Sequence, residues 1–424
     1  MSEPLWRSRP TAFEMLPATT VRHSKINDFI YLSEGNSNSF LIVTSEGRVV
    51  VNTGMGFEAP THKEYFDSID SGPIRYVIFT QGHVDHVGGA DHFIEEGTEI
   101  IAQANNLEHQ SYDNRLQPFR GKRSIFAFAK TIAAGFAYVK KLEKAGTPVS
   151  GQAQPKPTIT FEDRYAFELG GIEFELIAIS GAETEDSLVI WLPQHKICFT
   201  GNAFGALFGH FPNLVTIRGD RYRDALRYVE TLDKLLELDA EMLLVGHHEP
   251  VVGRELIRSE LERMRNAVLY VHDCVVIAMN GGEDVWSAMR DIRLPPELEV
   301  GEGYGKLPWS IRAIWEQYSG WFHARSTTEL YPVAPWSVWP DVVALAGGPD
   351  GFAEAAKKKL AAGAPVEALH LAELALEAEP DHAPSLDASL AAHRALLDQS
   401  VNFWETRWLE KEIASLENRL ESGR

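Results

Sequence analysis

One short segment constrains the fold more than any other. In it, an apolar run stops abruptly and is followed by side chains that can bind a metal. Residues 75–79 read RYVIF, and the chain continues as TQGHVDHVGGADHF. His83, Asp85 and His86 lie within four residues of each other. Short apolar runs bounded by turn residues indicate strands, and the loops that follow strands often carry function. The pattern therefore predicts two imidazoles and a carboxylate at the end of a strand.

Three other strand ends offer compatible side chains. Glu183 lies in SGAETEDS, Asn202 follows CFTG, and His247 opens the histidine pair of LVGHHEP. Catalytic zinc sites commonly use three protein ligands, which are His nitrogens or carboxylate oxygens, and leave one position open for water. We predict that His247 completes such a set with Asp85 and His86.

Composition excludes several other kinds of site and partner. Cys198 and Cys274 are the only cysteines, too few for a disulfide framework or a cysteine metal site. The formal net charge is −20, from 40 Lys and Arg against 60 Asp and Glu, and nucleic-acid binders need a surplus of basic residues instead. The N-terminal residues contain no apolar run long enough for a signal peptide or a membrane span. We expect a cytoplasmic protein without nucleic-acid or membrane partners.

The pattern of apolar residues divides the chain into three parts. Strand-like segments dominate the first part, apart from a helical insertion over residues 107–158. After Gly253 the apolar residues recur at spacings of three to five, which indicates helices. The final part is rich in Ala and Leu and resembles a tetratricopeptide helical hairpin. We predict domains at residues 1–254, 255–345 and 346–424.

Taken in order, the motifs resemble those of the metallo-β-lactamase superfamily. That superfamily carries THxHxDH, GHTxGS, FTGD and GHG behind a DTG strand, and this chain shows TQGHVDH, GAETEDS, FTGN and GHH behind NTG. The chain is most similar to the alkylsulfatase branch, which has GTE, LRG and paired-histidine motifs and a dimerisation domain. The matching segments here are GAE with Glu183, Ile217-Arg218-Gly219, His247-His248-Glu249-Pro250 and YGKLPWSIRAIWEQYSGWF.

The resemblance implies both an architecture and an activity. The fold would be α/β, an αββα metallo-β-lactamase sandwich followed by an all-α dimerisation domain with a tetratricopeptide-like end, and the protein would form a homodimer. We expect the branch's C-terminal sterol-carrier-like domain to be missing. The activity would be metal-dependent hydrolysis of a sulfate ester or a related small ester, with a small-molecule substrate that is anionic if the site binds sulfate.

The resemblance also implies roles for individual residues. A divalent metal on Asp85, His86 and His247 would lower the pKa of its water from about 16 to about 7. Asp85 would also orient that water, and His248 would donate a proton or hold the substrate. A simpler alternative for His248 is that it only satisfies backbone groups at the strand end.

Two more residues are expected to contact the substrate. Arg218 would clamp a sulfate or carboxylate through a bidentate hydrogen bond, and Asn202 would line the same pocket. An Arg218 that simply pairs with Asp220 or Asp224 would look identical in the sequence.

Three replacements separate this chain from the family pattern. Gln81 stands in place of the first metal-binding His, Asn52 in place of the Asp of DTG, and Asn202 at or beside the acidic residue that bridges two metals. A neutral amide offers only a carbonyl oxygen to a metal. The first site is therefore reduced to His83, Glu183 and Gln81, although Gln81 could instead cap the loop and Glu183 could lie in a solvated acidic loop. We expect one complete zinc site, with iron or manganese as alternatives, and a second site that is weak, different in identity or absent.

Three functions fit these observations. The favoured one is the ester hydrolase described above. The second is a divergent metalloenzyme of this fold that acts on a lactone or carboxylic ester or performs iron-dependent chemistry. The third is a non-catalytic scaffold protein, which the intact Asp85, His86 and His247 set argues against.

Overall fold

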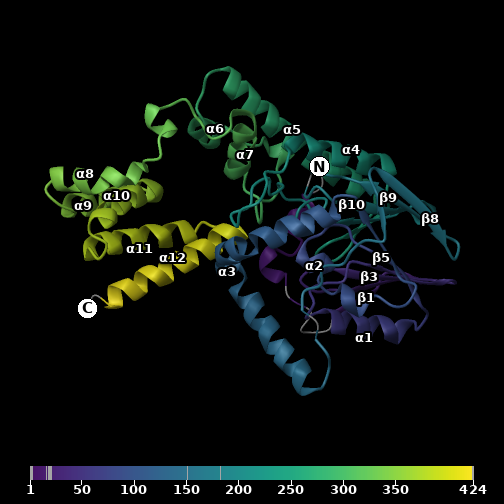
Figure 1. Ribbon diagram of the computed structural model, residues 1–424. Helices are drawn as coiled ribbons and strands as arrows, with labels where there is room; N and C mark the ends of the chain where they lie inside the picture. Colours follow the sequence, from purple (N-terminus) through teal and green to yellow (C-terminus); the bar gives the residue numbers. More distant parts are fainter. Residues whose placement is uncertain (1–2, 16, 18–21, 150, 182, 423–424) are drawn as a thin grey trace. The chain divides into compact units, whose positions relative to one another are not determined.

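The structure is a computed structural model that describes residues 3–15, 17, 22–149, 151–181 and 183–422. It divides into two compact units, Met1–Tyr318 and Ser319–Arg424 (Figure 1). The predicted domain limits near residues 254 and 345 fall inside these units and remain predictions.

The first unit contains two β-sheets. The seven-stranded sheet has its described strands in chain order, antiparallel from β1 to β4 and parallel from β4 to β7. Its strands are β1 (His23–Lys25), β2 (Ile30–Ser33), β3 (Ser39–Thr44), β4 (Gly47–Val51), β5 (Ile74–Ile78), β6 (Glu99–Gln103) and β7 (Ile159–Phe161). The predicted strand at residues 75–79 is thus β5, displaced by one residue.

The second sheet has six described strands in the order β13-β12-β11-β10-β9-β8. Only the β11–β12 pair among them is parallel. These strands are β8 (Arg164–Leu169), β9 (Ile172–Ala178), β10 (Leu188–Leu192), β11 (Ile197–Gly201), β12 (Met242–Val245) and β13 (Val251–Val252). The parallel pair places the ends of β11 and β12, with Asn202 and His247 just beyond them, at the same edge.

Strand alternation builds four layers. In β4, Val49 and Val51 pack into the core between the sheets, whereas Val50 packs into a second core beneath α1 (Ala59–Ile69). In β10, Ile190 faces the central core and Val189 faces α4 (Ala225–Leu238) and α5 (Arg254–Asn280). Figure 1 shows the layers running from α4 and α5 through both sheets to α1. The predicted αββα sandwich is confirmed.

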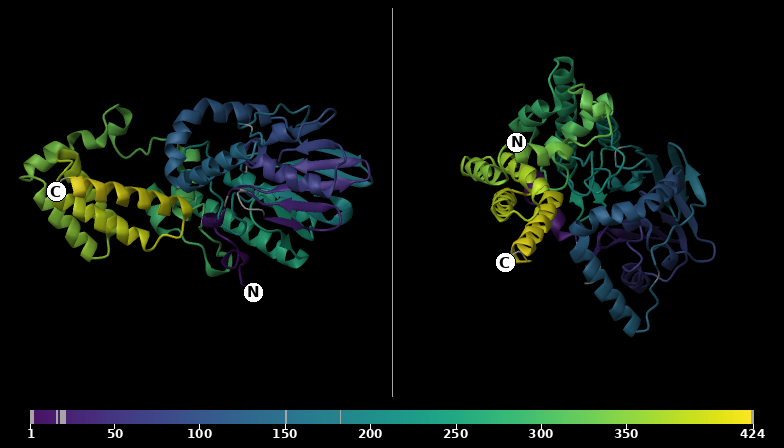
Figure 2. Two further views of the ribbon diagram at one scale, coloured as in Figure 1. Left: turned by 90° about the horizontal axis from the view of Figure 1, so that it is seen from below. Right: turned by 60° about the vertical axis from the view of Figure 1, so that its left-hand side comes forward.

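The first unit has four further α-helices among its described residues, and the last residue of α7 falls in the second unit. They are α2 (Val84–Val87), α3 (Asn106–Lys144), α6 (Val285–Asp291) and α7 (Leu307–Ser319). Helix α3 falls in the predicted helical insertion and is bent into two arms (Figure 2). It contains Pro118, which removes one helical hydrogen bond and kinks a helix.

The second unit is helical throughout its regular structure, as predicted. Its longer helices are α8 (Trp339–Leu345), α9 (Asp350–Ala361), α10 (Pro365–Ala378), α11 (Ala383–Leu397) and α12 (Phe403–Ser422). Small buried residues such as Ala356, Ala372 and Ala392 form the contact between α9, α10 and α11, because alanine lets helix axes approach closely. No helix in the described ranges is both long and apolar enough to cross a membrane.

Candidate metal centre

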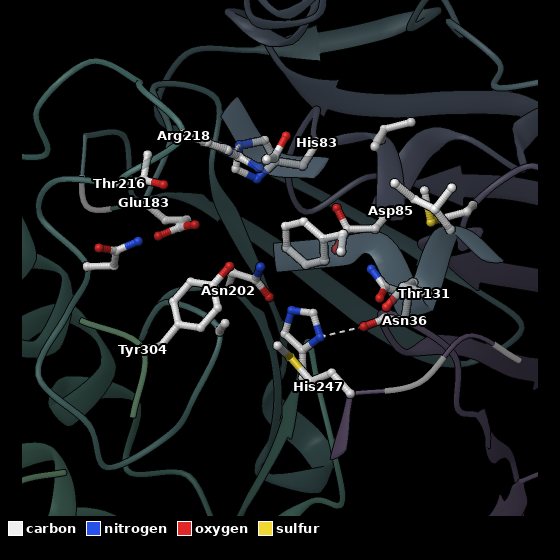
Figure 3. Close-up of a pocket in the computed structure, with 18 of the residues that line it drawn as sticks. Asn36, His83, Asp85, Thr131, Glu183, Asn202, Thr216, Arg218, His247 and Tyr304 are labelled. Atoms are coloured by element: carbon white, nitrogen blue, oxygen red, sulfur yellow. Dashed lines mark hydrogen bonds between the residues drawn. The ribbon is translucent and has the colours of Figure 1, made fainter. Parts of the chain in front are cut away.

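Polar strand ends from both sheets converge on one cavity of about 480 Å³. Its lining includes most of the residues singled out in the sequence, and Figure 3 shows them facing a common space. They are His83, Asp85, Glu183, Asn202, Arg218 and His247. Because these residues come from distant parts of the chain, the fold rather than local sequence brings them together.

The loop after β5 turns sharply to present its side chains. His83 has extended backbone angles and precedes α2, whose single turn carries Asp85 and His86. Gly89 follows this turn, and a Cβ there would collide with the backbone oxygen of Thr53. The glycine pair after the histidines therefore lets α2 pack directly on the end of β4.

Asp85, His86 and His247 form a compact group. One ligand atom from each lies within 4.8 Å of the others, and His86 Nε2 lies 3.7 Å from an Asp85 carboxylate oxygen. His247 Nδ1 donates a hydrogen bond to the Asn36 carbonyl at 2.7 Å, the dashed line in Figure 3. This bond fixes the tautomer that leaves His247 Nε2 free to bind a metal.

His86 is prepared in a similar way. Its Nδ1 lies 3.4 Å from the Thr80 hydroxyl, and its buried Nε2 has no hydrogen-bond partner among the described residues. Burial lowers the pKa of His86 to about 4 and also lowers the pKa of His247. A buried, unpaired imidazole nitrogen is costly, so this neutral, pre-oriented group fits a divalent cation.

Gln81, His83 and Glu183 are arranged differently. The side-chain amide of Gln81 lies 2.7 Å from His83 Nδ1, and Arg218 Nη2 lies 3.3 Å from His83 Nε2. Arg223 Nη1 forms an ion pair with Glu183 at 2.6 Å, and both side chains are buried. Each residue of the reduced first site thus has an internal partner, which does not fit a second metal bound in the family's manner.

Glu183 does not lie in a solvated loop. It is 9% exposed, and burial raises the pKa of Glu183 to about 7, although the guanidinium groups of Arg223 and Arg218 oppose that rise. Arg223 was not singled out in the sequence. An ion pair between residues 40 positions apart leaves no local pattern by which to find it.

Arg218 both pairs with a neighbouring carboxylate and lines the cavity where an anion would bind. It pairs with Asp220, with 3.6 Å between Nη2 and the carboxylate, and it lines the cavity. Its buried Nε has no partner within the described part of the chain, so the guanidinium keeps hydrogen-bonding capacity for an anion. The structural pairing and the anion-binding role are therefore compatible.

His248 lies to one side of the cavity. It lines a separate small pocket together with Glu34 and Asn38, and its backbone is in the left-handed region at φ +63°. Burial lowers the pKa of His248 to about 4, which leaves little of the protonated form at neutral pH. Its proposed proton-donor role remains a prediction.

Two further residues near His83 had not been noticed in the sequence. His109 and Asp113 lie on α3, and their ligand atoms come within 4.8 Å of each other and of one on His83. The His109 and His83 rings meet edge to face with centroids 5.0 Å apart. The i, i+4 spacing of His109 and Asp113 on one helix face is the signal in the sequence that points to this pair.

The cavity wall away from the polar strand ends is largely apolar. Helix α3 supplies Ile125, Phe128 and Ile132, and the loop after β4 supplies Met55 and Phe57. The site therefore combines a polar end that contains Arg218 with an apolar flank able to accommodate a hydrocarbon group.

Comparison with known proteins agrees with this architecture. Residues 32–247 match the metallo-beta-lactamase superfamily, and residues 287–417 match the family described as alkyl sulfatase dimerisation. A linear primary-alkylsulfatase from a Pseudomonas species is 27% identical over 397 residues, covering 90% of this chain and 74% of the relative. An alkyl/aryl-sulfatase from Saccharomyces cerevisiae is 24% identical, covering 80% of this chain and 55% of the relative.

A solved structure shares the fold. The stereoselective inverting sec-alkylsulfatase from a Pseudomonas species superposes with a TM-score of 0.80 at 21% identity, covering 95% of this chain and 66% of that one. Apart from the primary-alkylsulfatase, this chain spans less than two thirds of the length of these relatives. With more than half of its residues matched, the chain belongs to the metallo-beta-lactamase superfamily and carries an alkyl sulfatase dimerisation region after the sandwich.

Proposed function

We propose that this protein is a metal-dependent hydrolase of sulfate esters with an apolar alcohol part. The observation that carries the proposal is the Asp85, His86 and His247 group, whose buried His86 Nε2 lacks a partner among the described residues beside a cavity that contains Arg218. The alkylsulfatase relatives support the choice of substrate class.

The metal would be zinc, since two imidazoles and one carboxylate form a ligand set that zinc commonly uses in catalytic sites. A divalent cation held there supplies a Lewis acid that lowers the pKa of a coordinated water. The carboxylate of Asp85 has a second oxygen that can accept a hydrogen bond from the attacking water and so orient it.

The sulfate group would be bound by the polar end of the cavity. Arg218 can donate to a sulfate oxygen from its Nε, which has no partner among the described residues, in a charge-assisted hydrogen bond. Asn202 lines the same cavity, and its amide can reach a third oxygen. The hydrocarbon part would lie against Ile125 and Ile132.

We also propose that two copies associate through the region that matches the dimerisation family. Sedimentation of the purified protein tests this, and a single monomeric species at micromolar concentration would contradict it. The cytoplasmic location expected from the two cysteines remains a prediction.

The test is turnover by zinc-loaded protein on a medium-chain alkyl sulfate, the matching carboxylic ester, a lactone and a phosphate ester. We expect hydrolysis of the alkyl sulfate that is lost with a chelator and in His86→Ala. His195→Ala is the matched control, because His195 is exposed and lies outside the cavity. Preferential hydrolysis of a lactone or carboxylic ester would refute the substrate class, and chelator-resistant turnover would refute the metal dependence.

A further inference from the structure

The ion pair between Glu183 and Arg223 is built into the fold on several sides. Arg223 Nη1 lies 2.6 Å from Glu183 and also donates to the Asn213 carbonyl at 2.8 Å. The Arg223 backbone N–H donates to the Leu214 carbonyl, and its own carbonyl accepts from Gln317. With both charged side chains below 9% exposure, the guanidinium is a fixed positive charge on the carboxylate that would otherwise serve a first metal.

His83 is similarly occupied. One ring nitrogen faces the Gln81 amide and the other faces Arg218. Among the fully buried atoms of Gln81, His83 and Glu183 in the described structure, the Gln81 amide oxygen lacks a hydrogen-bond partner. A neutral amide oxygen is a weak anchor for zinc, which prefers imidazole, thiolate and carboxylate ligands.

The two guanidinium groups also oppose a second metal, even though Asp220 pairs with Arg218 and Glu183 with Arg223. Arg223 contacts Glu183, and Arg218 contacts His83. A divalent ion between these two residues would lie beside both guanidinium groups, and repulsion between charges a few ångströms apart in a buried site is strong. Arginine stays protonated at any physiological pH, so this repulsion cannot be relieved by loss of a proton.

We propose that the Arg223 guanidinium takes the place of the first metal, so that the protein holds one catalytic ion per chain. This inference rests on the proposed metal set of Asp85, His86 and His247. Arg223 neutralises Glu183, and Arg218, which pairs with Asp220, keeps a buried Nε without a partner among the described residues. That donor can bind an oxyanion, so the one-metal centre retains a guanidinium group where the sulfate binds.

Metal counting on four proteins tests the proposal. Each is purified without metal, reconstituted with zinc, and analysed by native mass spectrometry and elemental analysis, with circular dichroism to verify folding. We expect one zinc per chain in the wild type and in Gln81→His, because Glu183 stays paired with Arg223 in both. The double variant Gln81→His/Arg223→Met should bind two. Arg227→Met, on the exposed face of α4, combined with Gln81→His is the matched control and should bind one.

The outcomes separate this inference from the proposed function. Two zinc ions in the wild type or in Gln81→His alone would overturn the inference and leave the proposed function standing. If His109→Ala then removed one of them, the second ion would belong to His83, His109 and Asp113. A folded double variant with one zinc would also overturn the inference. No zinc in the wild type would overturn both. The wild type and Gln81→His keep the test decisive even if Arg223→Met does not fold.

Discussion

The two halves of the centre contain similar residues but differ in their hydrogen bonds. His86 and His247 each have one nitrogen oriented by a hydroxyl or carbonyl, and the buried Nε2 of His86 has no partner among the described residues. Both nitrogens of His83 face protein groups, and Glu183 is paired with Arg223. Whether a residue can bind a metal thus depends on whether the fold leaves a lone pair on its ligand atom without a hydrogen-bond partner. Residue type alone does not show this.

Removing one imidazole from each half tests whether the two halves differ in metal binding. His247→Ala should lose the metal and reduce turnover of an alkyl sulfate by about 1,000-fold or more, because the ion provides most of the charge stabilisation. His83→Ala should keep one zinc per chain. Equilibrium dialysis measures the zinc content of both variants, and steady-state kinetics measures turnover. A His83→Ala protein that binds no zinc would contradict the division into two halves.

Removing the cation that contacts His83 should affect the substrate and leave the metal in place. Arg218→Met should raise KM for an alkyl sulfate about 10- to 100-fold, because a charge-assisted hydrogen bond contributes about 1.5–3 kcal/mol. The zinc content should not change. The control is Arg221→Met, an exposed neighbour. An unchanged KM would remove Arg218 from the anion site, and loss of zinc would make it part of the metal half.

The orientation of His86 can be tested through its hydroxyl partner. Thr80→Val removes the group facing His86 Nδ1 and should weaken zinc binding about tenfold, since partners of metal ligands typically contribute 10- to 100-fold in affinity. Competition with a chromophoric chelator gives the zinc affinity. Thr160→Val, on an exposed position of β7, should leave it unchanged. Equal affinities in the wild type and Thr80→Val would show that His86 needs no such orientation.

The smallest expected effect concerns the apolar flank. Ile125→Gln should raise KM for a long-chain alkyl sulfate about fivefold and leave KM for a short-chain one unchanged, because the lost contact is worth about one buried methylene. Steady-state kinetics on both chain lengths provides the measurement. Equal changes for both substrates would place the hydrocarbon part elsewhere.

Sequence reasoning anticipated features that repeat locally. Alternating apolar residues and turn signals located β5 to within one residue, and the ordered motifs indicated the αββα sandwich. The same motifs named Asp85, His86 and His247, which the fold brings together. They also named Gln81 as a departure, without revealing that its amide would face His83.

The sequence could not predict contacts between residues that only tertiary packing brings together. Arg223 lies far along the chain from Glu183, and nothing in its neighbours indicates a buried ion pair. His109 and Asp113 lie on α3, so their proximity to His83 depends on how that helix packs against the loop that follows β5. The change near residue 254 marks a switch in secondary structure, although α4 and α5 share one hydrophobic core.

The most direct test of the one-metal centre is anomalous diffraction at the zinc absorption edge from crystals of the zinc-loaded wild-type protein. We expect one anomalous peak per chain, bound by Asp85, His86 and His247, with Glu183 still paired to Arg223. A second peak of comparable occupancy coordinated by His83 and Glu183 would contradict it.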